Sequence, residues 1–216
     1  VQNPTGCSIN LPTAHAILQV AERHDMMVVD DDPFIDLPGT EGTRLGSLDQ
    51  FRRVIQIGSY SKLMSPSLRS GFIIAEVEVA RSLTELKMVT TVASSVFVER
   101  LVADTIRTRR YEKHLGRFVK RLADNRIKGA EKLRSMGLEV SGAGTGGLYG
   151  WLTLPEGVDD LEIARAAAEQ SVFLAPGVLF KASADCRGPG LRINWTRIND
   201  TRFFSFLRGA LSDNAR

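Results

Sequence analysis

Apolar residues recur at helical spacing in residues 11–25, and Asn10 and Pro12 suit the cap and the first turn of a helix there. A continuous apolar run follows at residues 26–29 and ends abruptly in the polar residues 30–33. This order is typical of a buried parallel strand that delivers polar side chains to its carboxyl end. The pattern therefore predicts a helix followed by a strand of an α/β sheet.

Two more apolar runs repeat this arrangement. Residues 54–58 lead into the segment 59–62, which reads Ser-Tyr-Ser-Lys, and a third run follows at residues 71–75. We therefore expect part of a doubly wound sheet up to about residue 90. Residues 79–136 then show helical patterning throughout, without proline, and predict two or three consecutive helices.

The last third of the chain shows a different alternation. Short strands are predicted at residues 138–140, 148–152, 172–175 and 191–195, with helices at residues 160–170 and 200–211. Short elements of both kinds favour a second, smaller α+β domain. The predicted boundary divides the chain into residues 1–112 and 113–216.

The composition is that of an ordinary globular protein, with 43% hydrophobic residues, 25% charged residues and a formal net charge of +3. No apolar run reaches the roughly 18 residues of a membrane-spanning helix, so we expect no membrane span. Cys7 and Cys186 have neither the spacing nor the nearby histidines of a disulfide framework or a zinc site. We therefore expect two free thiols in a reducing cytoplasm, and no metal.

Basic residues are concentrated in one stretch of the chain. Residues 107–134 hold 11 Lys and Arg against 3 acidic residues. A helix that carries them could meet phosphates, but no helix-turn-helix or other nucleic-acid motif accompanies the stretch. A solvated charged face is therefore the interpretation that we favour.

Polar residues at the predicted strand ends form a set that suits a single ligand. Lys62 lies near serine hydroxyls and Arg69, and nearby cations together with desolvation favour the neutral amine that forms Schiff bases. Asp31 suits the nitrogen of a pyridine ring, because a carboxylate keeps that nitrogen protonated. The hydroxyls of Ser59 and Ser61 suit a phosphate monoester, as does the guanidinium of Arg69.

Arg192, much later in the chain, offers the planar fork that pairs with a substrate carboxylate. The order of this arginine, of residues 3–6 (Asn-Pro-Thr-Gly) and of the strand-end residues resembles the fold-type I pyridoxal-phosphate family, the class I and II aminotransferases. The resemblance runs the length of the chain. Through the segments 31–34, 66–71 and 111–115 it is closest to the aminotransferase-like domain of MocR-type GntR regulators and to 2-aminoadipate-like aminotransferases.

The resemblance implies a role for each of these residues. Lys62 would bind the aldehyde of pyridoxal 5'-phosphate, and Asp31 would pair with its ring nitrogen. Asn3 would donate a hydrogen bond to the phenolic oxygen of the cofactor, from a turn in which the Asn3–Pro4 bond is cis. Arg192 would bind the α-carboxylate of the substrate. The residues implied to bind the phosphate are Ser59, Ser61 and Arg69.

The chain departs from the family in two ways. Phe34 stands where many members have a tyrosine that also bonds the phenolic oxygen, so the cofactor would lose one hydrogen bond. The family's glycine-rich phosphate loop, its ring-stacking aromatic and the tyrosine lent by the partner subunit precede residues 3–6, and none is in this chain. We therefore expect an α/β fragment: the C-terminal part of a doubly wound aminotransferase large domain, followed by a smaller α+β domain.

Three functions stay open at this point. An aminotransferase would move an amino group between an L-amino acid and a 2-oxo acid, with Lys62 as the base and Asp31 stabilising the charge on the ring. A MocR/GntR-type regulator would sense a ligand here and contact DNA only through a further N-terminal domain. A remnant that binds no cofactor is the third. We favour the aminotransferase, expect a homodimer because the family is typically dimeric, and expect the isolated fragment to be inactive.

Overall fold

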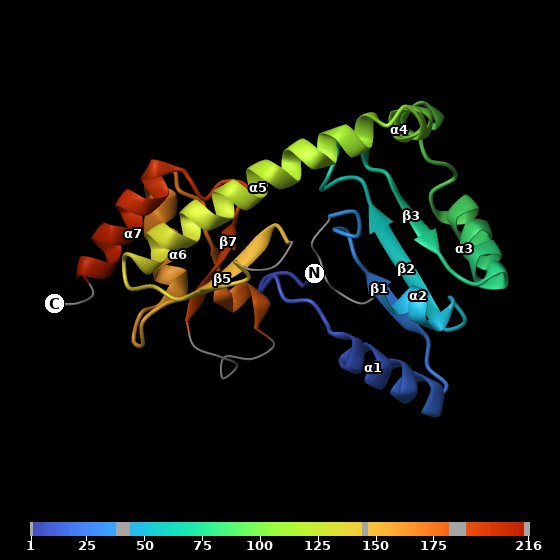
Figure 1. Cartoon of the computed structure of the whole chain (residues 1–216), viewed down its shortest axis with the longest axis horizontal. Helices are drawn as coiled ribbons and strands as arrows, with labels where there is room; N and C mark the ends of the chain where they lie inside the picture. The colour runs from blue at the N-terminus through green and yellow to red at the C-terminus, as the bar shows by residue number, and fades with distance from the viewer. Residues whose placement is uncertain (1, 38–43, 144–146, 182–188, 214–216) are drawn as a thin grey trace. The chain divides into compact units, whose positions relative to one another are not determined.

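The computed structural model describes residues 2–37, 44–143, 147–181 and 189–213, with the elements drawn in Figure 1. The chain forms two compact units. Unit 1 consists of residues 8–118, and unit 2 consists of residues 2–7 and 119–216. That residues 1–112 belong to a large domain and residues 113–216 to a small one stays a prediction.

Unit 1 is built on a three-stranded sheet with the order β1-β2-β3. Strand β1 (Val28–Asp31) pairs in parallel with β2 (Val54–Ser59), which confirms the predicted α/β arrangement. The ladder continues through Asp30 and Asp31, so β1 ends two residues later than predicted. Strand β3 (Gly71–Ile74) pairs antiparallel with β2, because the segment between them is too short for a crossover connection.

Two helices pack against β2. Helix α1 (Leu11–Arg23) begins where the sequence predicts it, and the side chain of Asn10 accepts a hydrogen bond from the N–H of Thr13 at 2.9 Å. Helix α2 (Leu45–Asp49) has only five residues and is not predicted by the sequence pattern. One buried apolar cluster joins these elements and contains Ala14, Leu45 and Val54.

The predicted helical stretch forms three helices, α3 (Val77–Thr90), α4 (Val96–Arg107) and α5 (Arg110–Arg134). Side-chain caps mark the starts of α3 and α4. Left-handed residues separate the helices, Val92 with φ 65° and Arg109 with φ 58°. The prediction of two or three consecutive helices is thus confirmed.

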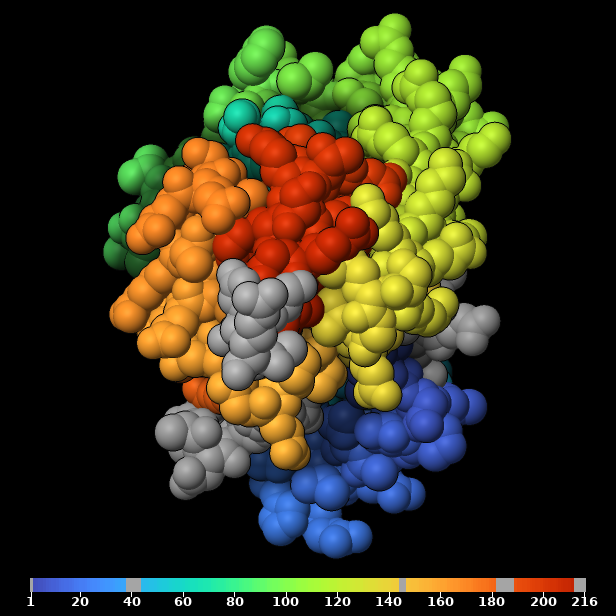
Figure 2. Space-filling model, turned by 90° about the vertical axis from the view of Figure 1, so that its left-hand side faces the viewer, coloured from blue at the N-terminus to red at the C-terminus, as the bar shows by residue number. Residues whose placement is uncertain are grey.

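Unit 2 contains a second sheet, with the order β4-β5-β7-β6 and antiparallel pairing throughout. Trp195, which follows β7, is fully buried in its core. Figure 2 shows helix α7 at the surface between α6 and the second half of α5. The elements of this unit are β4 (Val140–Ser141), β5 (Tyr149–Thr153), α6 (Asp160–Glu169), β6 (Ala175–Pro176), the 3-10 turn η2 (Gly177–Phe180), β7 (Gly190–Asn194) and α7 (Thr201–Asp213).

Three strands begin two or three residues later than predicted, and each of them follows a helix. The predicted starts at residues 26, 138 and 172 correspond to observed starts at residues 28, 140 and 175. The preceding residues Asp25, Gly137 and Ser171 have positive φ, and each next amide donates to a helix carbonyl five residues earlier. An amide that closes a helix in this way is not available to a sheet, so the strand starts farther on.

Asp49, at the end of α2, fixes the start of β2. Asp49 is 6% exposed, and its Oδ2 accepts hydrogen bonds from the backbone N–H groups of Arg53 and Val54, the latter at 3.1 Å. Buried backbone N–H groups that lose their acceptor are costly. Asp49 therefore satisfies the first amides of the strand that leads to Lys62.

Replacing Asp49 tests this arrangement. We expect Asp49→Ala to lower the free energy of unfolding of the full-length protein by about 1–3 kcal/mol, because two backbone donors lose their acceptor. Asp49→Asn keeps one acceptor oxygen and loses less. Urea unfolding at neutral pH measures both, and equal midpoints for Asp49→Ala and the wild type would contradict the interpretation.

Candidate functional site

The carboxyl ends of β1 and β2 carry the two residues that the sequence predicts to do the chemistry. Asp31 is the last residue of β1, and Ile57 is its register partner on β2. Strand β2 ends at Ser59, three residues before Lys62. Because the two strands run in the same direction, Asp31 and the segment that carries Lys62 reach the same edge of the sheet in unit 1 (Figure 1).

Lys62 lies in residues 60–70, which we call the lysine loop. The N–H of Tyr60 donates to the carbonyl oxygen of Ser70 at 3.0 Å, which extends the β2–β3 ladder and closes the base of the loop. The N–H of Met64 donates to the carbonyl oxygen of Tyr60 at 2.8 Å and forms a single helical turn. Lys62 is exposed on this turn, whereas its neighbour Leu63 is 2% exposed.

The predicted phosphate ligands also belong to this part of unit 1. Ser59 and Ser61 lie together, since Oγ of Ser59 accepts the backbone N–H of Ser61 at 3.2 Å. A hydroxyl that accepts one hydrogen bond keeps its own hydrogen for a ligand. Arg69 is exposed near the far end of the lysine loop, where it ends the 3-10 turn η1 (Pro66–Leu68) with a φ of 46°.

The three consecutive aspartates after Val29 lie in different environments. Asp30 is half-buried, and burial together with the charge of Asp32 raises its pKa above the usual value. Asp32 accepts the backbone N–H of Phe34 at Oδ1, at 3.1 Å, and so serves the turn that follows. Asp31 is the one exposed aspartate of the three.

Phe34 is buried at the position where the resemblance noted in the sequence implies a tyrosine in many aminotransferases. The residue is 2% exposed, and its ring has no hydroxyl group to offer a ligand. The residue therefore contributes to packing under the turn after β1, and the hydrogen bond that the usual tyrosine would provide has no donor at this position.

Arg192 and Asn3 come together in unit 2, although they are 189 residues apart in the chain. Nη1 of Arg192 donates to Oδ1 of Asn3 at 3.1 Å. The guanidinium carbon lies 4.4 Å from the ring centroid of Tyr149 and 5.3 Å from that of Phe180, so two aromatic faces hold it. The Asn3–Pro4 bond is cis, as predicted. Since Oδ1 of Asn3 accepts from Arg192, its amide nitrogen remains a donor for a ligand.

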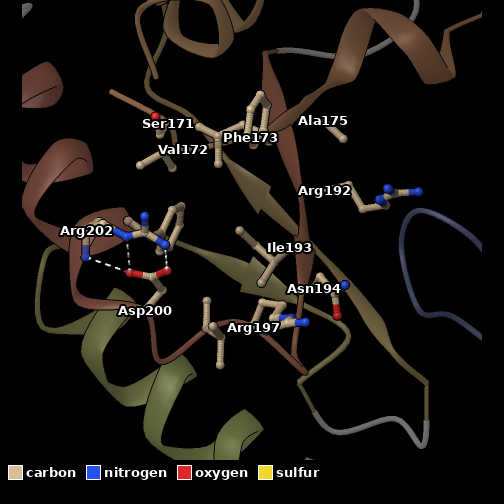
Figure 3. A pocket seen from close by; sticks show the side chains of 13 residues that line it. Ser171, Val172, Phe173, Ala175, Arg192, Ile193, Asn194, Arg197, Asp200 and Arg202 are labelled. Atoms are coloured by element: carbon tan, nitrogen blue, oxygen red, sulfur yellow. Dashed lines mark hydrogen bonds and ion pairs between the residues drawn. The ribbon is translucent and has the colours of Figure 1, made fainter. Parts of the chain in front are cut away.

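A pocket of about 520 Å³ in unit 2 lies on the side of β7 opposite to the guanidinium of Arg192 (Figure 3). Ile193 points into this pocket, whereas the guanidinium of Arg192 points away from it. An ion pair between Asp200 and Arg202, at 2.6 Å, lines one wall. The guanidinium of Arg192, which is predicted to bind the carboxylate of a substrate, therefore does not project into this pocket.

Tyr111 and His114, in the first turns of α5, are residues to which the sequence analysis assigns no role in the site. The hydroxyl of Tyr111 donates to Oδ2 of Asp36 at 2.8 Å, and Nε2 of His114 lies 2.8 Å from the carbonyl oxygen of Leu63. Burial, followed by the hydrogen bond to Asp36, raises the pKa of Tyr111 far above its usual value. The two residues are three positions apart on a predicted helix, and this spacing already places them on the same face of that helix.

Comparison with known proteins identifies the family. The family described as "Aminotransferase class I and II" matches residues 1–201. The chain belongs to this family. Both the resemblance noted in the sequence and the predicted α/β fold are thereby confirmed.

The relatives of this aminotransferase-family chain include both enzymes and regulators. It is similar to aromatic-amino-acid aminotransferase 1 from Thermococcus litoralis, with 28% identity over 93% of this chain and 49% of that protein. It is also similar to the HTH-type transcriptional regulator NorG from Staphylococcus aureus, with 26% identity over 82% of this chain and 41% of that protein.

A solved structure shows the same fold. Kynurenine aminotransferase from Pyrococcus horikoshii, in complex with PMP, matches all of this chain and 55% of its own length, with a TM-score of 0.84 and 26% identity. The chain therefore spans about half the length of the proteins that it matches.

The donor set of unit 1 fits the chemistry of pyridoxal 5'-phosphate group by group. Lys62 offers an amine for the aldehyde, and Asp31 offers an exposed carboxylate for the ring nitrogen. Hydroxyl and guanidinium donors for the phosphate come from Ser59, Ser61 and Arg69. Each of these cofactor groups thus has a complementary residue within one compact unit.

The structure also describes the surroundings of the acidic, histidine and cysteine side chains and the apolar character of the helices. Among the described residues, no group of three or more His, Cys, Asp or Glu side chains is placed to hold a metal ion. In the same part of the chain, no helix has the length and apolar character needed to cross a membrane. Cys7 is exposed and free, and Cys186 lies outside the described residues.

The raised pKa of Tyr111 predicts a pH dependence of stability. The pKa of Tyr111 is higher in the folded state than in the unfolded state, where it is about 10. The stabilisation by the neutral phenol is therefore complete below about pH 10, and it decreases as the pH rises from there toward the folded-state pKa. We expect the difference in unfolding free energy between wild type and Tyr111→Phe to be constant at pH 7–9 and to fall from about pH 10. Urea unfolding across this range measures the difference, and a difference that stays unchanged up to pH 11 would contradict the prediction.

Proposed function

We propose that the protein transfers an amino group between an L-amino acid and a 2-oxo acid with the help of pyridoxal 5'-phosphate. The observation that carries the proposal is the parallel pairing of β1 and β2. It brings the exposed carboxylate of Asp31 and the lysine loop to one edge of a sheet, where α/β proteins bind their ligands. Membership of the aminotransferase family and the similarity to an enzyme in complex with PMP support the same proposal.

Lys62 and Asp31 have the central roles. When bound, the cofactor supplies an aldehyde that reacts with primary amines and a protonated pyridine ring that withdraws electrons. Lys62 would hold the aldehyde through its amine, and the free amine at Nζ would accept the proton from the Cα atom of the bound amino acid. Asp31 keeps the ring nitrogen protonated through its carboxylate, which sustains the withdrawal of electrons.

The remaining site residues bind and orient. Ser59, Ser61 and Arg69 are the proposed ligands of the phosphate, because hydroxyls and a guanidinium donate well to phosphate oxygens. Asn3 donates from its amide nitrogen to the phenolic oxygen of the cofactor. Arg192 binds the α-carboxylate of the substrate, and the flanking aromatic rings of unit 2 support it by holding its guanidinium in one orientation.

A second candidate is a ligand-sensing domain of a MocR/GntR-type regulator. The similarity to the regulator NorG over 82% of this chain favours it specifically. In that case the same residues would bind an amino acid, and the readout would be a change in DNA binding instead of turnover. The coding sequence upstream of residue 1 separates the two candidates, since a winged-helix domain there supports the regulator and its absence supports the enzyme.

We also propose that the protein works as a homodimer. Large apolar side chains on and between α3 and α4 are exposed, including Val89 at 83%, Val92 at 78% and Phe97 at 76%. Exposed apolar surface of this extent is typical of a protein interface. A second copy of the chain is the partner that most soluble oligomers use.

Covalent trapping tests the role of Lys62. We expect borohydride treatment of the full-length protein with pyridoxal 5'-phosphate to attach the cofactor to Lys62, as located by peptide mass spectrometry. Lys62→Ala should lose the attachment and the visible absorbance band of the loaded protein. Lys87→Ala, which removes an exposed lysine of the same unit, is the matched control. Equal labelling of Lys62→Ala and the wild type would overturn the assignment.

A second test concerns Arg192. We expect Arg192→Lys to raise the KM for 2-oxoglutarate and other 2-oxo acids by about 10- to 100-fold, because a lysine cannot form two parallel hydrogen bonds to a carboxylate. The kcat at saturation should change less. Arg197→Lys, in the neighbouring turn, is the control, and the proposal fails if both variants show the same KM as the wild type.

A further inference from the structure

The first turns of α5 present two polar side chains to the loops that follow β1 and β2. Tyr111 and His114 are three residues apart and therefore lie on the same face of the helix. Tyr111 is 7% exposed, and His114 is partly buried. Each makes one hydrogen bond to a different loop of unit 1.

Tyr111 holds the loop after β1. Its hydroxyl donates to Oδ2 of Asp36 at 2.8 Å, five residues beyond Asp31 in the chain. Between these two aspartates, Phe34 and Ile35 are buried at 2% and 5% exposure, so the loop is packed as well as hydrogen-bonded. A charge-assisted hydrogen bond between a phenol and a carboxylate is among the stronger ones in proteins.

His114 holds the lysine loop. A carbonyl oxygen only accepts, so Nε2 of His114 carries the proton and donates to the carbonyl of Leu63 at 2.8 Å. The ring of His114 stacks on Phe118, with 6.2 Å between centroids and 21° between planes, which sets its orientation. Leu63 is the residue directly after Lys62.

An aromatic contact joins the two attachments. The ring of Tyr60, the first residue of the lysine loop, packs edge-on against that of Tyr111 with 5.9 Å between centroids. On its other side, Tyr60 contacts Phe72 of β3 at 5.6 Å. One helical turn of α5 therefore contacts the lysine loop at two points and the loop after β1 at a third.

We propose that Tyr111 and His114 are positioning residues that fix Lys62 relative to Asp31. The proposal rests on the proposed function, because it concerns the placement of an amine and a carboxylate that would act on one cofactor. His114 reaches the lysine loop at buried Leu63, next to exposed Lys62. Neither Tyr111 nor His114 is assigned a contact with substrate or cofactor.

The physical reason is preorganisation. Lys62 sits on a single helical turn of a loop, and loops hold functional groups less accurately than strands do. Misplacement by about 1 Å of a group that must react costs orders of magnitude in rate. Hydrogen bonds from a long helix to Leu63, next to Lys62, and to Asp36, in the loop that follows Asp31, reduce this freedom before any ligand arrives.

Hydrogen exchange tests the positioning role in the absence of cofactor. In the full-length protein, we expect His114→Leu to speed exchange of the amides of residues 61–64 by about three- to tenfold, the factor that one net hydrogen bond provides. His114→Gln retains an N–H donor and should restore slow exchange. Asn125→Ala removes a 2.7 Å side-chain hydrogen bond elsewhere on α5 and is the matched control, which should leave these amides unchanged.

Cofactor binding provides the second readout. Tyr111→Phe keeps the ring and removes only the hydroxyl, and we expect it and His114→Leu to weaken binding of pyridoxal 5'-phosphate by about three- to tenfold. The kcat should fall more than the KM for the amino acid changes, because Lys62 acts in the chemical step. Asn125→Ala and His114→Gln should bind the cofactor as the wild type does.

The outcomes separate this proposal from the proposed function. Faster exchange confined to residues 61–64, together with rescue by His114→Gln, supports positioning. Uniformly faster exchange across unit 1, or unchanged cofactor affinity in both variants, would overturn it and leave a purely structural role. If the wild type takes up no cofactor at Lys62, the proposed function fails, while the exchange measurement still decides whether His114 orders the lysine loop.

Discussion

The parallel pairing of β1 with β2 is the constraint on which the arrangement of unit 1 depends. The register that sets Asp31 opposite Ile57 also sets the distance along the sheet edge from the aspartate to the start of the lysine loop. A slip by one residue would turn Asp31 to the other face of the sheet. Residues on the buried face of β2, which packs against α1 and α2, oppose such a slip because their burial would be lost.

The residues at the strand ends were predictable because their signal is local. A run of apolar residues that stops at a polar cluster indicates the end of a parallel strand to within two residues, and this pattern placed Asp31 at the end of β1 and Lys62 just after β2. The starts of strands were less predictable. Asp25 and Ser171 follow their helices in a left-handed conformation that glycine usually adopts. Because neither residue is a glycine, the sequence does not indicate that the next backbone amide still binds to the helix.

The contacts that hold the loops were not predictable from local patterns. The hydrogen bond from Tyr111 joins residues 75 positions apart, and that from His114 joins residues 51 apart. Each hydrogen bond depends on how α5 packs against the ends of the sheet. The sequence around a single histidine in a basic helix does not predict that packing. The role of Phe34 is intermediate, since its apolar character suggests burial while only the fold shows what it packs under.

Unit 2 is discontinuous in sequence, because residues 2–7 belong with the segment that begins at residue 119. The 189 positions between Asn3 and Arg192 correspond to about 10–40 s of synthesis at ordinary ribosomal rates. During that interval the first segment of the unit has been made but lacks its arginine partner. A nascent chain can thus assemble the sheet of unit 1 well before Asn3 and Arg192 can meet. If the ribosome stalls before β7, the side-chain amide of Asn3 lacks its hydrogen bond from the guanidinium of Arg192.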